Sequence, residues 1–144
     1  MARISIDLPE TYLFSTSISV RITDLNYGGH VGNDAILSII HEGRMQFLQH
    51  YGYSEKDLAG AGLIMGDVAI VFKNEAFYGD VLQVSITVSD LSKATFDLIY
   101  KLEKKVDDRI VPVAFAKTGM VCFDYNKRRV MPIPDEIKTK WATG

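Results

Sequence analysis

The sequence contains a single cysteine, Cys122, among its 144 residues. The chain can therefore form no internal disulfide bond and no metal site built from several thiolates, a composition that suits a reducing compartment. No segment approaches the ~20 consecutive apolar residues that cross a bilayer. The N-terminus also lacks a basic region followed by an apolar run of about 7 to 15 residues, the pattern of a secretory signal peptide. We therefore expect a soluble, cytoplasmic protein.

The sequence also lacks an excess of charge of either sign. Its 16 Lys and Arg residues nearly balance 18 Asp and Glu residues, and the two signs are interspersed. Such a chain has no positive field that would attract nucleic acid. A hydrophobic fraction of 47% over 144 residues is enough for one compact core. We expect one domain spanning residues 1–144, with no nucleic-acid partner and no membrane association.

One long helix is predicted between residues 33 and 51. Asn33 is the expected N-cap, and Gly52 is expected at the C′ position. Gly43 lies within the apolar stripe of this helix, where a larger side chain would hold a packing partner away, so we expect close contact with a sheet. The stripe follows helical spacing and consists of Ile36, Ile39, Ile40, Phe47, Leu48 and Tyr51.

Strand patterns lie on both sides of this helix. The candidates are residues 13–22, 64–77, 81–91, 93–105 and 110–125. In the fourth segment Phe96, Leu98, Tyr100 and Leu102 alternate with polar residues and are expected to point inward. The tail from residue 128 contains two prolines and is expected to run along the surface.

These elements predict an α+β fold, with a five-stranded, mostly antiparallel sheet around one long helix. A sheet with a single helix leaves one face or one edge strand without a packing partner. We therefore expect a homo-oligomer, most simply a two-fold dimer.

The stretch RITDLNYGGHVGNDAILSII, residues 21–40, places three polar side chains just before the helix. They are the candidate catalytic residues. His30 can act as a general base near neutral pH, Asn26 can donate a hydrogen bond or orient a water, and Asp24 can fix the histidine tautomer or support the loop. Structural alternatives stay open, since His30 can merely bond the backbone in a turn and Asn26 can form an Asx-turn.

Candidate substrate-binding residues surround the start of the helix. Amides near Gly32 and Asn33 have no partner within the helix and can stabilise an oxyanion. Gly29 and Gly32 let a substrate approach the backbone closely. Arg128 belongs to a basic turn, residues 127–129, that can pair with phosphates, although a solvated hairpin turn is the simpler reading.

The sequence resembles the hot-dog fold, and in particular the 4-hydroxybenzoyl-CoA thioesterase-like family of acyl-CoA thioesterases. The motifs are VRITDLNYGGHVGNDAIL followed by HEGRMQFL, AFYGDVL before a strand, and TGMVCFDYNKRRVMPIP near the end. They span residues 14 to 136. The resemblance implies a dimer or tetramer with active sites between subunits, and coenzyme A as the partner of the basic turn. It also implies a catalytic aspartate at the position of Asn26. An amide cannot serve as that base or nucleophile, which leaves the identity of the base open.

Three functions follow from this resemblance. The first is an acyl-CoA or acyl-carrier-protein thioesterase that releases a carboxylic acid and a free thiol. The second is a non-catalytic acyl-thioester binding protein, favoured by the missing carboxylate at Asn26. The third is a hot-dog enoyl-CoA hydratase, because hydratases carry an Asp-x-Asn-Pro-x-His pattern that DLNYGGH resembles without its proline and with one added residue.

Other reactive residues have structural interpretations. HEGRM is not the His-Glu-x-x-His zinc motif, and we expect no metal and no cofactor. Glu42 lies off the apolar stripe and is expected to be solvated or in an interface. Cys122 falls within an apolar strand and is expected to be a buried, unreactive thiol.

Overall fold

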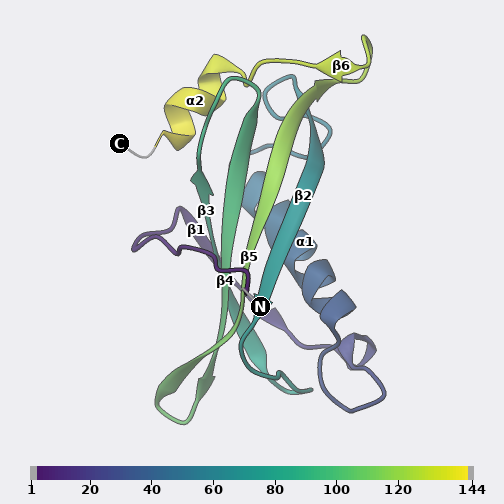
Figure 1. The fold of residues 1–144 in the computed structure, drawn as a ribbon, viewed down its shortest axis with the longest axis vertical. Helices are drawn as coiled ribbons and strands as arrows, with labels where there is room; N and C mark the ends of the chain where they lie inside the picture. Colours follow the sequence, from purple (N-terminus) through teal and green to yellow (C-terminus); the bar gives the residue numbers. More distant parts are fainter. Residues whose placement is uncertain (1–2, 143–144) are drawn as a thin grey trace.

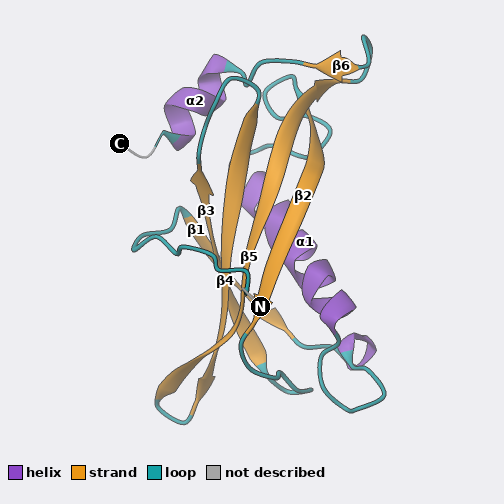
Figure 2. Ribbon diagram, in the orientation of Figure 1, coloured by secondary structure: helices purple, strands orange, loops and turns teal. Residues whose placement is uncertain are grey.

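An antiparallel sheet and one long helix make up most of the structure (Figures 1 and 2). The computed structural model describes residues 3–142. Its elements, in chain order, are β1 (Phe14–Ser19), the 3-10 turn η1 (Ile22–Asp24), α1 (Asn33–His50), β2 (Gly62–Phe72), β3 (Val81–Ser89), β4 (Thr95–Val106), β5 (Arg109–Asp124), β6 (Arg129–Val130) and α2 (Asp135–Trp141).

The strand order in the sheet is β1-β3-β4-β5-β2, and the short strand β6 pairs with β5. Every pairing is antiparallel. This arrangement confirms the α+β prediction and adds a two-residue sixth strand to the five that were expected. β1 and β2 are the two edges of the sheet, and β2 extends over 11 residues.

Helix α1 lies against one face of the sheet, as its apolar stripe predicts. Five of the six stripe residues are buried and Tyr51 is half-buried. Gly43 brings the helix close to β3, because a Cβ at this position would lie 3.1 Å from Cγ1 of Val84 and 3.4 Å from Cδ1 of Ile86. Strand β4 supplies its predicted inward series to the same core, where Phe96, Leu98, Tyr100 and Leu102 are all buried.

The C-terminal tail differs from its prediction as a surface segment. Residues 135–141 form α2, which buries Ile137 and Trp141. The Trp141 ring lies 5.1 Å from that of Phe47 in α1 and 5.7 Å from that of Phe96 in β4, measured between centroids. Packing of this one large ring holds the tail against the core, and the two prolines that suggested an exposed tail precede the helix.

The ends of α1 agree in part with the sequence. Gly52 has a φ of +82° directly after the C-cap residue Tyr51, so its C′ assignment is confirmed. The N-cap is Gly32, so the assignment of Asn33 was wrong; Asn33 is the first helical residue. Among the helices of residues 3–142, none is long and apolar enough to span a membrane.

Candidate active site

The loop before α1 closes as a tight turn that directs His30 back toward the helix. The N–H of Asn26 donates to the carbonyl of His30 at 2.8 Å, and the N–H of Gly29 donates to the carbonyl of Asn26 at 3.1 Å. Gly29 has a φ of +82°, which a residue with a side chain adopts only with strain. Gly29 therefore allows the backbone to form this turn.

Asn26 takes part in this turn through its side chain. Its Oδ1 accepts the N–H of Gly28 at 2.9 Å, which is the Asx-turn geometry that the sequence left open. Nδ2 of Asn26 has no hydrogen-bond partner within the described residues. A Cβ at Gly28 would lie 3.3 Å from Oδ1 of Asn26 and 3.6 Å from Nε2 of His30. The two side chains thus flank one glycine, and an amide donor and an imidazole lie near each other.

The imidazole of His30 is oriented by the backbone. Its Nδ1 lies 3.1 Å from the carbonyl oxygen of Val31. A carbonyl oxygen can only accept a hydrogen bond, so Nδ1 carries the proton in the neutral ring and Nε2 keeps its lone pair. The ring is half-buried. This is the tautomer that a general base acting through Nε2 requires.

Asp24 has a supporting geometry. Its buried carboxylate accepts the backbone N–H of Arg21 at 2.7 Å and Nη2 of the same residue at 3.1 Å. Its carbonyl oxygen accepts the N–H of Gly32 at 3.1 Å. The contact at Nδ1 of His30 is made by Val31, so of the two roles considered for Asp24 the geometry favours support of the loop.

The start of α1 has backbone amides without partners inside the helix. No side chain caps this helix end within the described chain, and the first helical hydrogen bond runs from the N–H of Ile36 to the carbonyl of Gly32 at 3.1 Å. The amides of Asn33, Asp34 and Ala35 precede that bond and have no partner inside the helix. They add partial positive charge at this end.

His30 and Asn33 line one cleft of about 180 Å³. Apolar residues of α1, β2 and β5 contribute to its lining, and the segment that follows β2 forms another wall. The full lining is His30, Val31, Asn33, Ile36, Phe72, Lys73, Asn74, Glu75, Ala76 and Val113. The cleft therefore joins a potential base, the helix start and an apolar surface.

The wall residues Lys73, Asn74 and Glu75 were missed by the sequence analysis. They were assigned to a strand extending to residue 77, whereas β2 ends at Phe72. The available signal was the run of three polar residues after an apolar strand. That run indicates a loop, but it does not indicate what the loop faces.

Asp24 and Glu42 line a different groove, of about 420 Å³, beside the exposed side of α1. Glu42 is exposed and accepts Nε2 of Gln46 at 2.8 Å. Arg128 is not brought to the His30 loop in a single chain. It lies in the β5–β6 turn, at the opposite end of the sheet (Figure 1).

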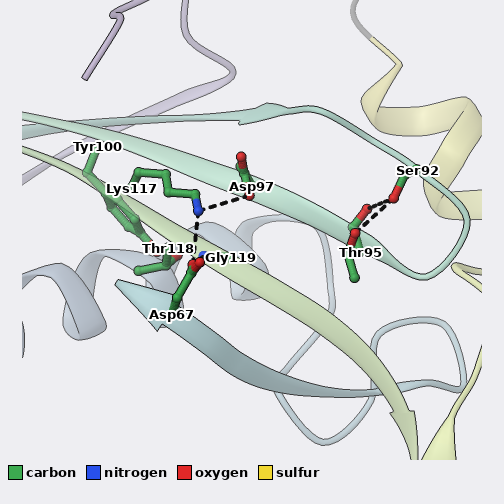
Figure 3. A network of polar contacts seen from close by, with 8 residues as sticks. All are labelled: Asp67, Ser92, Thr95, Asp97, Tyr100, Lys117, Thr118 and Gly119. Carbon is green, nitrogen blue, oxygen red and sulfur yellow. Dashed lines mark hydrogen bonds and ion pairs between the residues drawn. The ribbon is translucent and has the colours of Figure 1, made fainter. Parts of the chain in front are cut away.

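Other reactive groups lie away from the cleft. Burial raises the pKa of the Cys122 thiol to about 11, so it is a poor nucleophile near neutral pH. In residues 3–142, no three His, Cys, Asp or Glu side chains gather so that they could hold a metal ion. A network of Lys117, Asp67 and Asp97 lies on β2, β4 and β5 (Figure 3), where Nζ of Lys117 is 2.9 Å from Asp67 and 3.7 Å from Asp97.

Residues 20–141 match the family model of the thioesterase-like superfamily. A 1,4-dihydroxy-2-naphthoyl-CoA hydrolase from Microcystis aeruginosa is 31% identical over 122 residues, which cover 83% of this chain and 86% of that protein.

Solved structures of thioesterases share the fold. A 1,4-dihydroxy-2-naphthoyl-CoA thioesterase from Synechocystis has a TM-score of 0.77 and 24% identity, over 88% of this chain and 93% of that one. A mutant of 4-hydroxybenzoyl-CoA thioesterase complexed with 4-hydroxybenzoyl CoA has a TM-score of 0.80 and 14% identity, over 90% and 98%. The hot-dog fold prediction is confirmed, and the chain belongs to the thioesterase-like superfamily.

Proposed function

We propose that this protein hydrolyses acyl-CoA thioesters to a carboxylic acid and free coenzyme A. One observation carries the proposal: the same cleft is lined by His30, whose Nε2 has a free lone pair, and by Asn33 at the start of α1. Hydrolysis needs a base for the attacking water and donors for the carbonyl oxygen, and these two groups supply both. The relatives named above act on CoA thioesters.

In this mechanism Nε2 of His30 removes a proton from water as the water oxygen attacks the thioester carbon. The carbonyl oxygen becomes an oxyanion, stabilised by the amides of Asn33 and Asp34 at the helix start. The tetrahedral intermediate then expels the sulfur, which takes the proton from His30 and leaves as the thiol. Asn26 is not part of the cleft lining but lies beside Gly28 next to His30, and we assign its Nδ2 the role of orienting that water by a hydrogen bond to the water oxygen.

A non-catalytic acyl-thioester binding protein is the second candidate. Asn26 stands where the resemblance implies a catalytic aspartate, and its Oδ1 is already engaged by Gly28. The deciding experiment measures thiol release by the purified protein with short, long and aromatic acyl-CoAs, and with the corresponding acyl-carrier-protein thioesters. Turnover abolished in His30→Ala supports the thioesterase, whereas tight binding without turnover supports the binding protein. With an enoyl-CoA added to the panel, loss of enoyl absorbance without free thiol would indicate the hydratase.

The unpaired edge of β2 supports a dimer as the active assembly. Ile64, Met65, Val68 and Phe72 on this edge strand are each at least 37% exposed. An 11-residue strand with free backbone groups and exposed apolar side chains is a natural pairing edge. We therefore propose a two-fold dimer in which β2 of each copy pairs antiparallel with β2 of the other.

This symmetry offers a role for Arg128. Gly62 at one end of β2 pairs with Phe123, next to the β5–β6 turn, whereas Phe72 at the other end lines the cleft. Antiparallel pairing places the Gly62 end of one copy beside the Phe72 end of its partner. The basic turn of one copy then lies toward the cleft of the other, where Arg128 can pair with the phosphates of coenzyme A.

Two measurements test this assembly. Sedimentation equilibrium should give twice the chain mass, or four times if dimers associate further. Arg128→Ala should raise KM about tenfold for an acyl-CoA and leave KM for the matching acyl-pantetheine unchanged, because the latter lacks the nucleotide phosphates. A monomeric enzyme with full activity would contradict the dimer.

The single buried thiol, Cys122, suits a reducing compartment, and we propose a cytoplasmic location on that basis.

A further inference from the structure

Lys104 is a charged residue in an inward-facing position of β4. It continues the series Phe96, Leu98, Tyr100 and Leu102, and only 9% of its surface is exposed. A buried ammonium group is costly unless it is paired or fully hydrogen-bonded. Its surroundings show how that cost is met.

The ammonium of Lys104 holds the β2–β3 loop, residues 73–80, at two points. Nζ donates to the carbonyl of Glu75 at 2.8 Å and to Oδ2 of Asp80 at 3.0 Å. It also lies 5.0 Å from the centroid of the Phe77 ring. Asp80 closes the loop on itself, since its Oδ2 accepts the N–H of Phe77 at 2.8 Å. A single cation therefore fixes the start and the end of this loop.

The anchored loop is connected directly to the His30 region. Ala76, the residue after Glu75, accepts the N–H of Val31 through its carbonyl at 2.8 Å. The carbonyl of Val31 is the acceptor for Nδ1 of His30 at 3.1 Å. A continuous path of contacts thus runs from Lys104 through the loop and Val31 to the imidazole.

We propose that Lys104 is a positioning residue for thioester hydrolysis. Lys104 is not among the residues that line the cleft. By fixing the carbonyl of Glu75 it holds Ala76 against Val31, and so sets both the wall of the cleft and the orientation of His30. This role rests on the proposed function, because a misplaced base matters only if His30 takes part in the reaction. Displacements of about 1 Å in such a site can reduce turnover by up to ~100-fold.

The test compares Lys104→Met with Lys117→Met. Lys117 is the matched control, because its ammonium also pairs with an aspartate, Asp67 at 2.9 Å, but lies outside the cleft. Lys104→Met should lower kcat about tenfold or more, with a smaller change in KM, while Lys117→Met keeps wild-type values. Lys104→Arg retains a cation that can reach both acceptors and should recover kcat to within about threefold of wild type.

Native-state hydrogen exchange supplies a readout that does not depend on activity. In Lys104→Met the amide of Val31 should exchange about tenfold faster or more, while the amide of Leu98 in central β4 keeps its protection. If Lys104→Met does not fold, Asp80→Ala removes the carboxylate that is one of the two anchor points and should shift the Val31 amide in the same direction. Unchanged exchange at Val31 in the folded variant, or faster exchange with an unchanged kcat, would overturn the proposal. A wild-type protein without hydrolysis would instead overturn the proposed function, and the exchange data would still show whether Lys104 holds the loop.

Discussion

Nδ1 of His30 donates to the carbonyl of Val31, the residue that follows it, and the same Val31 is held through its N–H by Ala76. The imidazole is therefore tied to a backbone position that is itself fixed by the segment after β2. No carboxylate is needed to select the tautomer, which is consistent with Asp24 being engaged by Arg21.

Removal of the imidazole should strongly reduce turnover. His30→Ala is expected to lower kcat for the best acyl-CoA by about 100-fold or more, the usual contribution of a general base. His50→Ala is the matched control, since His50 lies at the far end of α1, where its ring centroid is 5.2 Å from that of Phe14. Thiol release, followed with a chromogenic disulfide, measures both. Equal rates for His30→Ala and wild type would exclude His30 as the base.

Two substitutions separate the structural and chemical roles of Asn26. Asn26→Asp keeps an acceptor for the N–H of Gly28 but loses the Nδ2 donor, so stability should stay within about 0.5 kcal/mol while kcat falls about tenfold. Asn26→Ala loses both groups and should also cost about 1 kcal/mol of unfolding free energy. Urea denaturation and thiol release give the two values. A rise in kcat for Asn26→Asp would show instead that a carboxylate at this position can act as the base or nucleophile.

The contact between Gly43 and β3 should limit what α1 tolerates. Gly43→Ala gains about 1 kcal/mol of helix propensity but places Cβ 3.1 Å from Val84, so we expect a net change below about 1 kcal/mol. Gly43→Val adds two further carbons to the same space and should lower the free energy of unfolding by about 1–3 kcal/mol.

Ser38→Val at an exposed position of α1 is the control for the Gly43 series and should change stability by less than about 0.5 kcal/mol. Urea denaturation compares the three variants. A Gly43→Val variant as stable as wild type would show that α1 and β3 can separate at no cost.

Asp67 and Asp97 lie on either side of Lys117 (Figure 3), and their pKa values should be shifted in opposite directions. The hydrogen bond from Lys117 lowers the pKa of Asp67, whereas desolvation by burial raises the pKa of Asp97. Because its pKa is lowered, Asp67 contributes stability at pH values above its unfolded-state pKa. That contribution is lost as the pH falls through its folded-state pKa. For Asp97 the contribution is present at low pH and is lost as pH rises through its folded value.

Carboxyl-carbon NMR titration of wild type and Lys117→Met checks this pair. Lys117→Met should raise the pKa of both carboxyl groups, because the lysine lowers each of them. Unchanged titration curves in the variant would show that the ammonium does not control either aspartate. The urea midpoint of Asp97→Asn relative to wild type should fall as pH is lowered through the acid range, since wild type alone gains the contribution of the protonated group.

The sequence predicted those features that depend on local periodicity. The stripe on α1, the inward series of β4 and the place of Gly43 follow from residue spacing alone, and all three are confirmed. The N-cap was misassigned because side-chain preference favours Asn33, whereas the chain conformation puts Gly32 there. A Cβ at Gly32 would lie 2.6 Å from Oδ1 of Asp34, so only glycine fits without displacing that carboxylate.

The missed features depend on contacts between distant segments. The burial of Trp141 requires Phe47 and Phe96 to form its site. The sequence near residue 141 does not indicate that these distant residues contact it. The wall of the cleft requires β2 to end at Phe72 and Lys104 to hold the segment that follows. For His30, the motif predicted a potential base near a helix start. Which ring nitrogen keeps its lone pair depends on the position of the Val31 carbonyl, which the motif does not indicate.

The enclosed indole of Trp141 gives the molecule an intrinsic optical reporter. It is the sole tryptophan of the chain, fully buried and surrounded by Phe47, Tyr51, Tyr53 and Phe96. Its fluorescence should be blue-shifted while α2 stays docked and should move to longer wavelength when water reaches the ring. Its neighbours come from α1, β4 and the loop after α1. The emission maximum therefore records whether α2 stays packed against α1 and β4, without any attached dye.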